Sequence, residues 1–441
     1  MYVRLYVCGG GLQLDSFHVV IAGSGLAAAA TALRLLEFGL RPLLLARELA
    51  VSPGVESLPE EALRFFTALG LESALLEAGA VRVEGFDNAW EEGAAVLKPG
   101  VLWHVERAAL ARRVLAEAVA RGASVLSVPR VPVLEEVEGA VRVTLEGETR
   151  TFLAAVDATG RSACWSRPVR AQGRQVARLF QVAPDAWGLR GRLCRAEGAW
   201  GYRLGLPEGV TVGLVTPDNH LSEPTAAQLH ERLRLQGATL RPLGQRPAFP
   251  QWTESPVRGR RISVGDAALA HDPLAGQGMR FALGTALAAV AVMRGWVESS
   301  PDARTGEDFY RELVEAERHR HLSLLARFHE RGSSETPGPL PTRQVEPFPA
   351  RVRFAGTVQT VGLHQDGRIL PGEALCLPDG SRVRWLGRID LLLLRELCPG
   401  PTPLPALLRR LEQAHLAHGE PRVLVQWALS RKVLVDATQE P

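Results

Sequence analysis

The chain has 441 residues, more than one hydrophobic core normally organises, so two or three domains are expected. Hydrophobic residues make up 46% of the sequence and charged residues 22%, as in ordinary globular proteins, and the formal net charge is only +3. Without a polybasic run, this composition argues against a nucleic-acid-binding protein. Five scattered cysteines without a CxxC pair argue against a zinc site or other metal site and against a disulfide framework.

The apolar stretches, of which 284–293 is an example, are too short to predict a membrane span. Residues 1–16 lack a basic segment followed by an apolar one, so they are interpreted as an N-terminal extension and not as a signal peptide. We therefore expect a soluble protein of the reducing cytoplasm.

The first elements along the chain form a β-α-β unit. Phe17–Ala22 is typical of a buried strand, Leu26–Phe38 of an alanine-rich helix, and Leu43–Leu45 of a second strand. Adjacent parallel strands need such a crossover, so a parallel sheet is predicted. A second helix is expected over Arg107–Arg121, ending at Gly122.

Two strand pairs around tight turns predict an antiparallel substrate layer, placed mainly within residues 165–255. Further along, a strand leads into a loop and two long helices. The predicted pairs are Val141–Leu145 with Thr151–Val156 and Tyr202–Leu206 with Val210–Val215; the later strand is Ile262–Val264, and the helices are Met279–Val297 and Thr305–His329.

A segment rich in proline, serine and threonine, residues 332–349, is interpreted as a linker. It separates a discontinuous main domain, residues 17–331, from a small domain, residues 350–441. The small domain is predicted to contain short strands followed by helices, one of which has Leu404, Leu407, Leu408 and Leu411 on a single face. The predicted strands are Arg351–Ala355, Val358–Leu363, Ala374–Leu377 and Arg382–Leu386.

The most specific motif, Gly23-Ser24-Gly25-Leu26-Ala27-Ala28, lies between the first strand and the first helix. Gly23 permits a tight turn, Gly25 lets a pyrophosphate approach the backbone, and Ala28 allows close packing of helix on strand. The helix start offers free N–H groups to the phosphates. For the acidic ribose ligand, the usual carboxylate position falls on Ala46, followed by Arg47 and Glu48. Either Glu48 takes that role after a small shift or the ribose is held otherwise.

Two later segments resemble motifs of FAD enzymes. Asp157-Ala158-Thr159-Gly160-Arg161 is similar to the turn that passes the nucleotide in the glutathione reductase superfamily. Gly265-Asp266 resembles the motif whose aspartate binds the ribityl chain. It continues into Asp272-Pro273-Leu274-Ala275-Gly276-Gln277-Gly278-Met279, which resembles the loop beneath the isoalloxazine ring. A glycine turn that opens a helix directs N–H groups at the part of reduced flavin that carries negative charge.

Further segments resemble tryptophan-halogenase-like flavoproteins over roughly residues 17–300: Gly54–Pro59, Trp103–Leu110, where Arg107 would contact the flavin chain, and Trp200–Pro207. Halogenation is disfavoured, because Lys98 does not match the position of the halogenase lysine. The chain is more similar to flavoprotein monooxygenases that mature quinone-cofactor enzymes, such as the one that hydroxylates a tryptophan of quinohemoprotein amine dehydrogenase.

This resemblance implies an α/β fold with a glutathione-reductase-type Rossmann domain, an antiparallel substrate sheet like that of para-hydroxybenzoate hydroxylase, and an α+β winged-helix-like C-terminal module. It implies FAD, dioxygen, and a reduced nicotinamide or reduced flavin as electron source. The implied reaction is hydroxylation of a peptidyl tryptophan through a flavin C4a-hydroperoxide during tryptophylquinone biogenesis, with a polypeptide substrate and a maturation complex as partners.

Three alternatives stay open. The first is a reductase or saturase like geranylgeranyl reductase, and the second is an FAD-bearing chaperone without catalysis. The third concerns the C-terminal module alone, which would be an oligomerisation or lid domain. His271, just before Pro273, is the candidate acid/base; the competing interpretation is a loop histidine that faces solvent or bonds the backbone. The pair His319 and His321 falls on different helical faces, so a metal site there is not expected.

Overall fold

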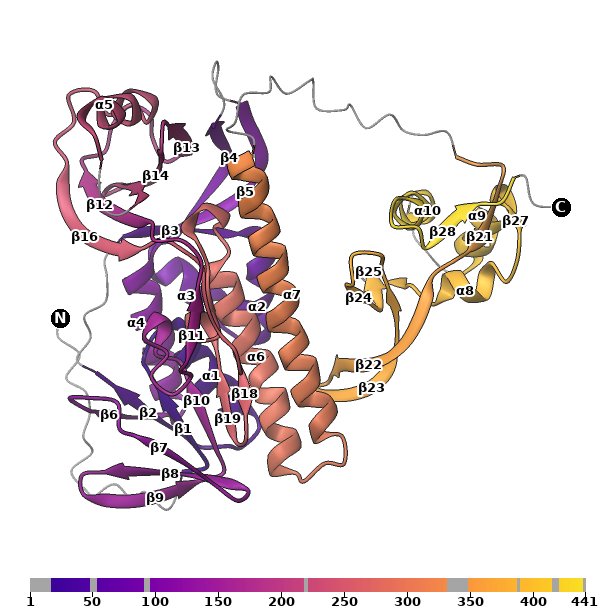
Figure 1. Ribbon diagram of the computed structural model, residues 1–441, viewed down its shortest axis with the longest axis horizontal. Coiled ribbons are helices and arrows are strands. Elements are labelled where there is room, and N and C mark those ends of the chain that lie inside the picture. Colours follow the sequence, from indigo (N-terminus) through magenta and orange to yellow (C-terminus); the bar gives the residue numbers. More distant parts are fainter. Residues whose placement is uncertain are drawn as a thin grey trace. The chain divides into compact units, whose positions relative to one another are not determined.

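The computed structural model describes residues 17–47, 54–90, 96–217, 221–330, 348–386, 389–414 and 420–438. The chain divides into two compact units (Figure 1). Unit 1 comprises residues 1–303 and 310–332, and unit 2 comprises residues 304–309 and 333–441. The predicted N-terminal extension and nearly all of the predicted linker lie outside the described residues. Residues 304–309, which the sequence placed in the main domain, group with unit 2.

The centre of unit 1 is a six-stranded sheet in the order β18-β19-β10-β1-β2-β6. The middle strand β1 (Val19–Ala22) runs parallel to β2 (Pro42–Ala46) on one side and to β10 (Ala154–Asp157) on the other. All three strands are buried along their whole length, as expected for apolar strands covered on both faces. The outer strands are β6 (Ser124–Ser127), β19 (Arg261–Ser263) and the antiparallel edge strand β18 (Val257–Arg258).

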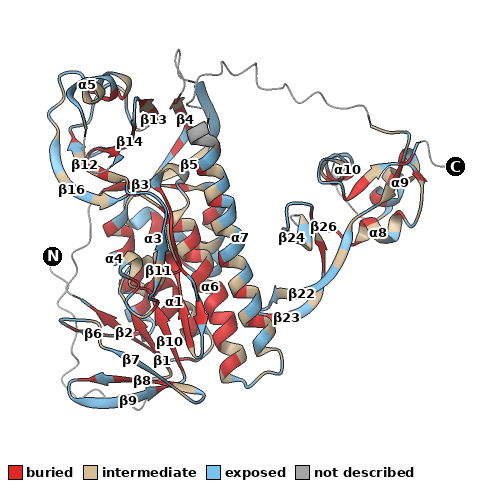
Figure 2. Ribbon diagram, in the orientation of Figure 1, coloured by how far each residue is buried: buried red, intermediate tan, exposed pale blue. Residues whose placement is uncertain are grey.

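Helices and a small antiparallel sheet pack around this centre. Helix α1 (Leu26–Glu37) contacts both α4 (Arg107–Ala120) and α6 (Gly278–Val297). Side chains of β1 and β2, such as Val20 and Leu43, share a core with Val143 and Phe152 of the small sheet. Buried residues accordingly concentrate in the central strands and on the inner faces of the helices (Figure 2). The strands of the small sheet are β7 (Leu134–Val137), β8 (Ala140–Leu145) and β9 (Glu148–Phe152).

The predicted pairing of Val141–Leu145 with Thr151–Val156 is wrong in its second strand. That segment contains the end of β9, which pairs with β8, and the start of β10, which joins the parallel sheet beside β1. Only Leu153 lies between the two strands. Periodicity does not separate two strands that follow each other so closely.

The second large sheet of unit 1 has eight strands in the order β16-β12-β15-β14-β13-β4-β5-β3. The predicted antiparallel pair forms, as β14 against β15. Five of its strands, β12 to β16, lie within the predicted range 165–255, and three more come from residues 55–106. The bounds are β3 (Val55–Pro59), β4 (Val81–Ala89), β5 (Val96–Glu106), β12 (Val176–Val182), β13 (Gly191–Ala196), β14 (Ala199–Leu206), β15 (Gly209–Thr216) and β16 (Arg241–Pro247).

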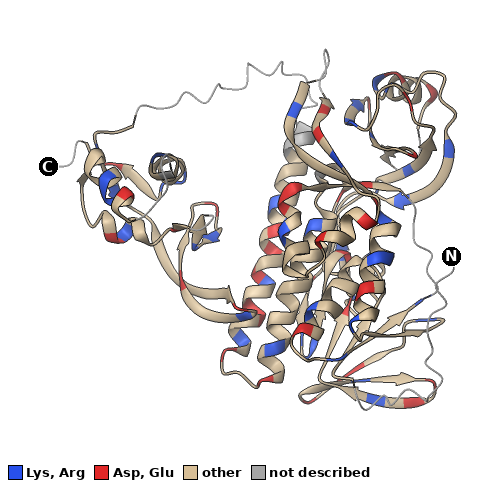
Figure 3. Ribbon diagram, turned by 180° about the vertical axis from the view of Figure 1, so that it is seen from behind, with Lys and Arg blue, Asp and Glu red and all other residues tan. Residues whose placement is uncertain are grey.

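Shorter elements lie between the strands of the two large sheets, and the long helix α7 follows α6. A three-stranded sheet in the order β11-β17-β20 leads into the loop before α6. The bounds are η2 (Glu60–Ala62), α2 (Leu63–Ala68), α3 (Glu72–Glu77), η3 (Gly160–Ser162), β11 (Val169–Ala171), α5 (Glu223–Arg232), β17 (Gln251–Thr253), η5 (Gly265–Ala267), β20 (Leu269–Ala270), η6 (Pro273–Ala275) and α7 (Ala303–Glu330). Acidic and basic residues are interspersed over the helices (Figure 3).

Among the described residues, α6 is the one helix long and apolar enough to cross a membrane by length and composition. Its bounds agree with the predicted helix Met279–Val297 to within one residue. Most of its apolar window, 61%, is buried inside the protein, which is typical of a core helix.

Unit 2 is an α+β module with its own core. Leu407 and Leu411 of the predicted amphipathic helix pack with Leu424 and Val352 in that core. Its strands are β21 (Arg351–Phe354), β22 (Thr357–Gln365), β23 (Arg368–Cys376), β24 (Arg382–Val383), β25 (Trp385–Leu386), β26 (Ile389–Asp390), β27 (Thr402–Pro403) and β28 (Leu434–Asp436); its helices are α8 (Leu393–Leu397), α9 (Leu404–Gln413) and α10 (Glu420–Ser430). The winged-helix assignment stays a prediction.

Candidate functional site

The glycine motif forms a tight turn at the carboxyl end of β1. Gly23 has φ +117°, and a Cβ atom there would lie 2.3 Å from the carbonyl oxygen of Ala158. The Gly23 N–H donates to Leu45 O at 2.9 Å, and the Ala158 N–H donates to Ala22 O at 2.9 Å. The turn is thereby joined to both neighbouring strands, at the edge of the sheet where doubly wound folds bind their ligands.

The start of α1 is open to a ligand. Gly25 is the N-cap residue and receives no side-chain cap, and the first turn contains no acidic residue. Chain neighbours apart, no atom of the described residues lies within 4 Å of a Cβ added to Gly25. Leu26 and Ala27 follow at the half-exposed start of the helix, and Ala28 is fully buried. The free N–H groups at this position suit an anion such as pyrophosphate.

The segment after β10 is held by the buried carboxylate of Asp157. Its Oδ1 accepts the N–H of Thr159 at 3.0 Å and the Thr159 hydroxyl at 2.6 Å. Its Oδ2 accepts the Trp165 N–H at 2.8 Å and the Ser166 hydroxyl at 2.7 Å. Four hydrogen bonds satisfy this buried charge. They hold Thr159 and Gly160 beside the glycine turn, while Asp157 itself has a structural role.

The Gly265 turn lies against the start of α1. A Cβ added to Gly265 would be 3.0 Å from Ala27 Cβ and 3.4 Å from Ala282 Cβ. The Gly265 N–H donates to Thr285 Oγ1 at 2.9 Å. The next residue, Asp266, is half-buried, and none of the described residues donates a hydrogen bond to its carboxylate. Two segments more than 200 residues apart in the sequence therefore meet here.

Arg107, the first residue of α4, joins this region electrostatically. Its guanidinium donates to Glu56 Oε1 at 2.9 Å. The negative charges of Glu56, first, and of Asp266 and Glu106 raise the pKa of Arg107. Glu106 caps α4 by accepting the N–H groups of Ala108 and Ala109. The predicted flavin-chain arginine is thus held near the predicted ribityl aspartate.

The predicted flavin loop opens a helix, as its glycines suggested. Pro273 begins the short helix η6, which Asp272 caps by accepting the Leu274 N–H at 2.8 Å. Gly276 has φ +58°, Gln277 is the N-cap of α6, and Gly278 and Met279 form its first turn. Burial raises the pKa of Asp272 to about 7, although the Leu274 N–H and Arg161 act in the opposite direction.

His271 is buried and bonded to a carboxylate, so neither competing interpretation of its side chain applies. Its Nε2 lies 3.1 Å from Glu317 Oε1 of α7, and its side chain is 3% exposed. Its ring contacts those of His321 and Phe281 edge to face, with centroids 4.6 Å and 5.0 Å away. Arg161 donates to the His271 carbonyl oxygen at 2.8 Å, which joins this residue to the turn after β10.

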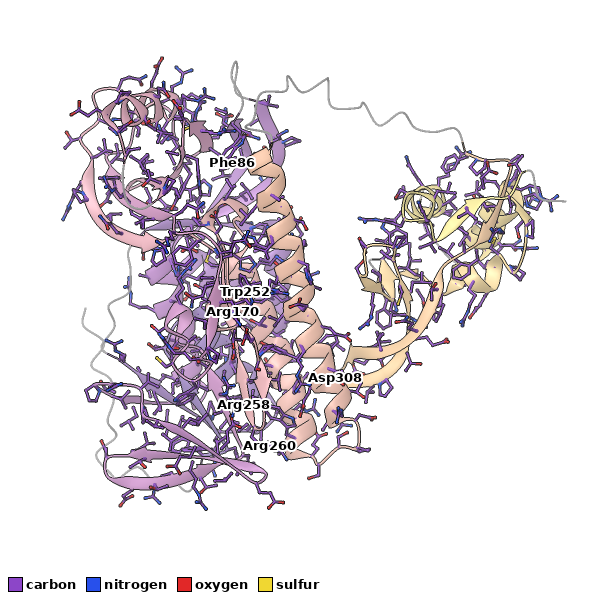
Figure 4. The ribbon with its side chains drawn as sticks, viewed as in Figure 1. Phe86, Arg170, Trp252, Arg258, Arg260 and Asp308 are labelled. Atoms are coloured by element: carbon purple, nitrogen blue, oxygen red, sulfur yellow. The ribbon has the colours of Figure 1, made fainter. Side chains whose placement is uncertain are left out.

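Aromatic side chains gather on the eight-stranded sheet beside the loop. The ring centroid of Trp200 lies 6.3 Å from that of Trp90 and 5.9 Å from that of Tyr202. Phe86 of β4 (Figure 4) and Leu274 of the loop pack against the same cluster. A buried apolar and aromatic cluster therefore borders the predicted flavin loop.

The other residues that the sequence analysis discussed are the ribose candidates, Lys98 and the histidine pair of α7. Arg47 is exposed at the end of β2, and Glu48 lies outside the described residues, so the ribose ligand stays a prediction. Lys98 is exposed on β5. His319 is 67% exposed and pairs with Glu315, while His321 is buried, which confirms that they occupy different faces. Within the described ranges no cluster of three or more metal-ligating side chains occurs.

Sequence reasoning missed Glu56, Arg161 and Glu317. Glu56 and Arg161 lie inside motifs that the sequence singled out, so their charge was a usable signal. Glu317 lies 46 residues after His271 on a helix rich in charge, and no sequence pattern connects the two.

No protein-family model and no curated protein matches the chain. Solved structures do. The peptidyl tryptophan dihydroxylase QhpG, essential for tryptophylquinone cofactor biogenesis, is 22% identical with a TM-score of 0.64, and the match covers 94% of this chain and 99% of QhpG. The flavin-dependent halogenase CmlS is 16% identical with a TM-score of 0.74, over 95% of each chain.

The myxobacterial chondrochloren halogenase CndH is 19% identical with a TM-score of 0.59, over 71% of this chain and 82% of CndH. At sequence identities this low, the structural matches establish the fold alone. The QhpG and CmlS matches cover so much of the chain that they extend into unit 2. The chain therefore has the α/β fold of flavin-dependent halogenases and of a tryptophan dihydroxylase.

Proposed function

We propose that this chain binds FAD and hydroxylates an indole ring, that of a tryptophan within a polypeptide. The observation that carries the proposal is the convergence of Gly23, Ala158 and Gly265 around the start of α1. Three separate segments place small residues at one edge of the parallel sheet, and the start of α1 adds free backbone N–H groups. This is the arrangement that a flavin dinucleotide needs.

Described residues from three segments would hold the parts of FAD. The open start of α1 at Gly25 would hold the pyrophosphate. Asp266 and Arg107 would hold the ribityl chain and its phosphate, and the loop Pro273–Met279 would border the ring system. Bound FAD would supply the activation of dioxygen. The protein would orient the substrate, exclude water and move protons.

Two observations support an aromatic substrate in a polypeptide. The cluster of Trp90, Trp200 and Tyr202 adjoins the loop through Leu274, so an indole bound beside the loop would have aromatic rings near it. The fold match to an enzyme described as a peptidyl tryptophan dihydroxylase covers 94% of the chain. On this proposal unit 2 binds the polypeptide.

The cofactor is tested on the purified protein as it is expressed. The bound flavin is released by heat and identified by chromatography against FAD and FMN standards. One FAD per chain, or tight binding of added FAD, supports the proposal. Purified protein that neither contains nor binds FAD overturns it.

The reaction is tested with tryptophan-containing peptides, a reducing system and isotopically heavy dioxygen. A gain of one or two heavy oxygen atoms on tryptophan, found by tandem mass spectrometry, is the expected result. Dioxygen-independent reduction of a lipid would favour the saturase alternative. Binding of the peptide with no mass gain would favour a chaperone.

A further inference from the structure

The two ring nitrogens of His271 have different surroundings. Nε2 lies 3.1 Å from Glu317 Oε1, a hydrogen-bond distance. Nδ1 is buried and has no hydrogen-bond partner among the described residues. A buried polar atom without a partner is uncommon in proteins and often marks a catalytic role or a bound water molecule.

Glu317 is held as a carboxylate. Burial alone would raise its pKa, but hydrogen bonds from His271 and Arg320 and the charge of Arg280 outweigh burial and lower the pKa well below its usual range. Arg280 of α6 donates to Oε1 at 2.9 Å, and Arg320 donates to both oxygens. An anionic carboxylate only accepts hydrogen bonds, so His271 must carry its proton on Nε2. In the neutral ring with its proton on Nε2, Nδ1 carries the lone pair.

The neighbouring ring has the opposite arrangement. His321 Nε2 accepts the backbone N–H of Asp272 at 3.0 Å, so its proton is on Nδ1. Burial lowers the pKa of His321 to about 3, which keeps it neutral. Its Nδ1 is also buried without a partner among the described residues. One ring thus offers a buried acceptor and the other a buried donor, with centroids 4.6 Å apart.

We propose that Glu317 is a positioning residue that fixes the tautomer of His271, so that the buried Nδ1 of His271 is the base that takes the proton released from the hydroxylated ring carbon. The inference rests on the proposed function. His271 directly precedes the flavin loop, and Arg161 fixes its backbone by binding its carbonyl oxygen. The carboxylate-histidine pair follows the logic by which a buried acid orients a catalytic imidazole.

The step balances. A C–O bond forms at the indole while the O–O bond breaks and leaves its electron pair on the second oxygen atom. The C–H bond at that carbon breaks, and its electron pair returns to the ring. The proton moves to Nδ1 of His271 and leaves to water afterwards. A reduced nicotinamide or reduced flavin supplies two electrons, and with two protons the second oxygen atom of dioxygen becomes water.

Charged and titratable groups face His271 from several elements, and the ionisation of each of them contributes to the pH profile of the reaction. Glu317, His321 and Arg320 belong to α7, Arg280 to α6, Arg161 to η3, and Asp272 to the loop itself.

The test compares Glu317→Gln with Glu315→Gln. Glu315 lies on the same helix and pairs with a histidine, His319, at 3.4 Å, but that pair is exposed. Imidazole nitrogen NMR on flavin-free, histidine-labelled protein reports the tautomer, and His271→Asn identifies the His271 signals. We expect His271 protonated at Nε2 in the wild type, and mixed tautomers only in Glu317→Gln, because an amide can both donate and accept.

On the loaded enzyme, Glu317→Gln should lower kcat at least about tenfold and change its pH profile, with KM within about twofold. Glu315→Gln should leave both unchanged. A His271 that is protonated at Nδ1, or whose tautomer survives Glu317→Gln, overturns the positioning role. Normal kcat and pH profile with a disturbed tautomer overturn the role in the reaction. If the wild type oxygenates no tryptophan peptide, the proposed function fails, while the NMR result still decides whether Glu317 positions His271.

Discussion

A Cβ atom on Gly23 would lie 2.3 Å from the carbonyl oxygen of Ala158, although the two residues are 135 positions apart. This close approach exists because β1 and β10 are adjacent parallel strands that end at the same edge. The turn that opens α1 and the turn that follows β10 therefore form one surface. The proposed flavin site depends on that surface more than on any single side chain.

Gly23→Ala should both destabilise the protein and abolish flavin binding. The methyl group would collide with the backbone of Ala158, and φ +117° is unfavourable for alanine. We expect a loss of unfolding free energy of about 3 kcal/mol or more. Chemical denaturation monitored by circular dichroism measures it. An unfolding free energy equal to that of the wild type would mean that the two turns do not need this close approach.

Gly25→Ala separates ligand binding from folding. A φ of −76° is favourable for alanine. Apart from its two chain neighbours, no described atom would lie within 4 Å of the new Cβ. Stability should therefore change by less than about 0.5 kcal/mol. The methyl group would occupy space that the pyrophosphate needs, so the FAD dissociation constant should rise about tenfold or more, equivalent to about 1.4 kcal/mol. Fluorescence titration of the flavin-free protein measures the constant, and unchanged affinity would place the phosphates elsewhere.

The sequence predicted those parts of the fold that local pattern determines. The helices near Leu26, Arg107 and Gly278, the strand pair around Pro207, and the glycine turns all occur where they were expected. Each has a local cause: apolar periodicity, or a glycine at a turn. The division of Thr151–Val156 between two sheets and the contribution of residues 55–106 to the large sheet depend on long-range pairing, which local pattern does not contain.

The candidate site was predictable to the same extent. Motif residues such as Gly23, Gly265 and Gly278 were located, because a tight turn limits which residues it accepts. The partners of His271 could not be located from the sequence. Glu317 and His321 reach it from a helix that begins 32 residues later, and their roles arise from packing and burial. Their sequence neighbourhood resembles that of any charged surface helix.

Gly213→Ala tests the aromatic cluster on the large sheet. Gly213 pairs with Tyr202 across β14 and β15, and a Cβ there would lie 2.2 Å from Tyr202 Cε1. The ring must move, at a cost of about 1–3 kcal/mol in unfolding free energy. Burial raises the pKa of Tyr202 to about 12, so displacement of the ring towards water should lower that pKa. Spectrophotometric titration of tyrosinate measures the pKa.

The same variant should raise KM for a tryptophan peptide without changing FAD content. Tyr202→Phe is the matched comparison, because it keeps the ring and removes only the hydroxyl group. If the ring supports the substrate, Tyr202→Phe should resemble the wild type. Equal effects of both variants on KM would assign the role to the hydroxyl group instead.

Asp272 should make the protein less stable as the pH rises towards neutrality. Burial raises its pKa from 3.8 to about 7 in the folded state. A carboxyl group with a raised folded-state pKa contributes stability that is fully present below about pH 4 and is lost as the pH rises to about 7. The loss amounts to at most about 4 kcal/mol. Glu317 acts in the opposite direction, because its lowered pKa gives stability that is lost only as the pH falls.

Asp272→Asn removes the Asp272 contribution and keeps an oxygen that can accept the Leu274 N–H. The variant should therefore gain stability relative to the wild type between pH 4 and pH 7, by up to about 4 kcal/mol. Urea denaturation at several pH values measures the difference. Asp272→Ser, which also keeps a capping oxygen, should show the same trend. A constant difference across this pH range in both variants would mean that the carboxyl group titrates outside it and that Asp272 is ionised beside the flavin loop at neutral pH.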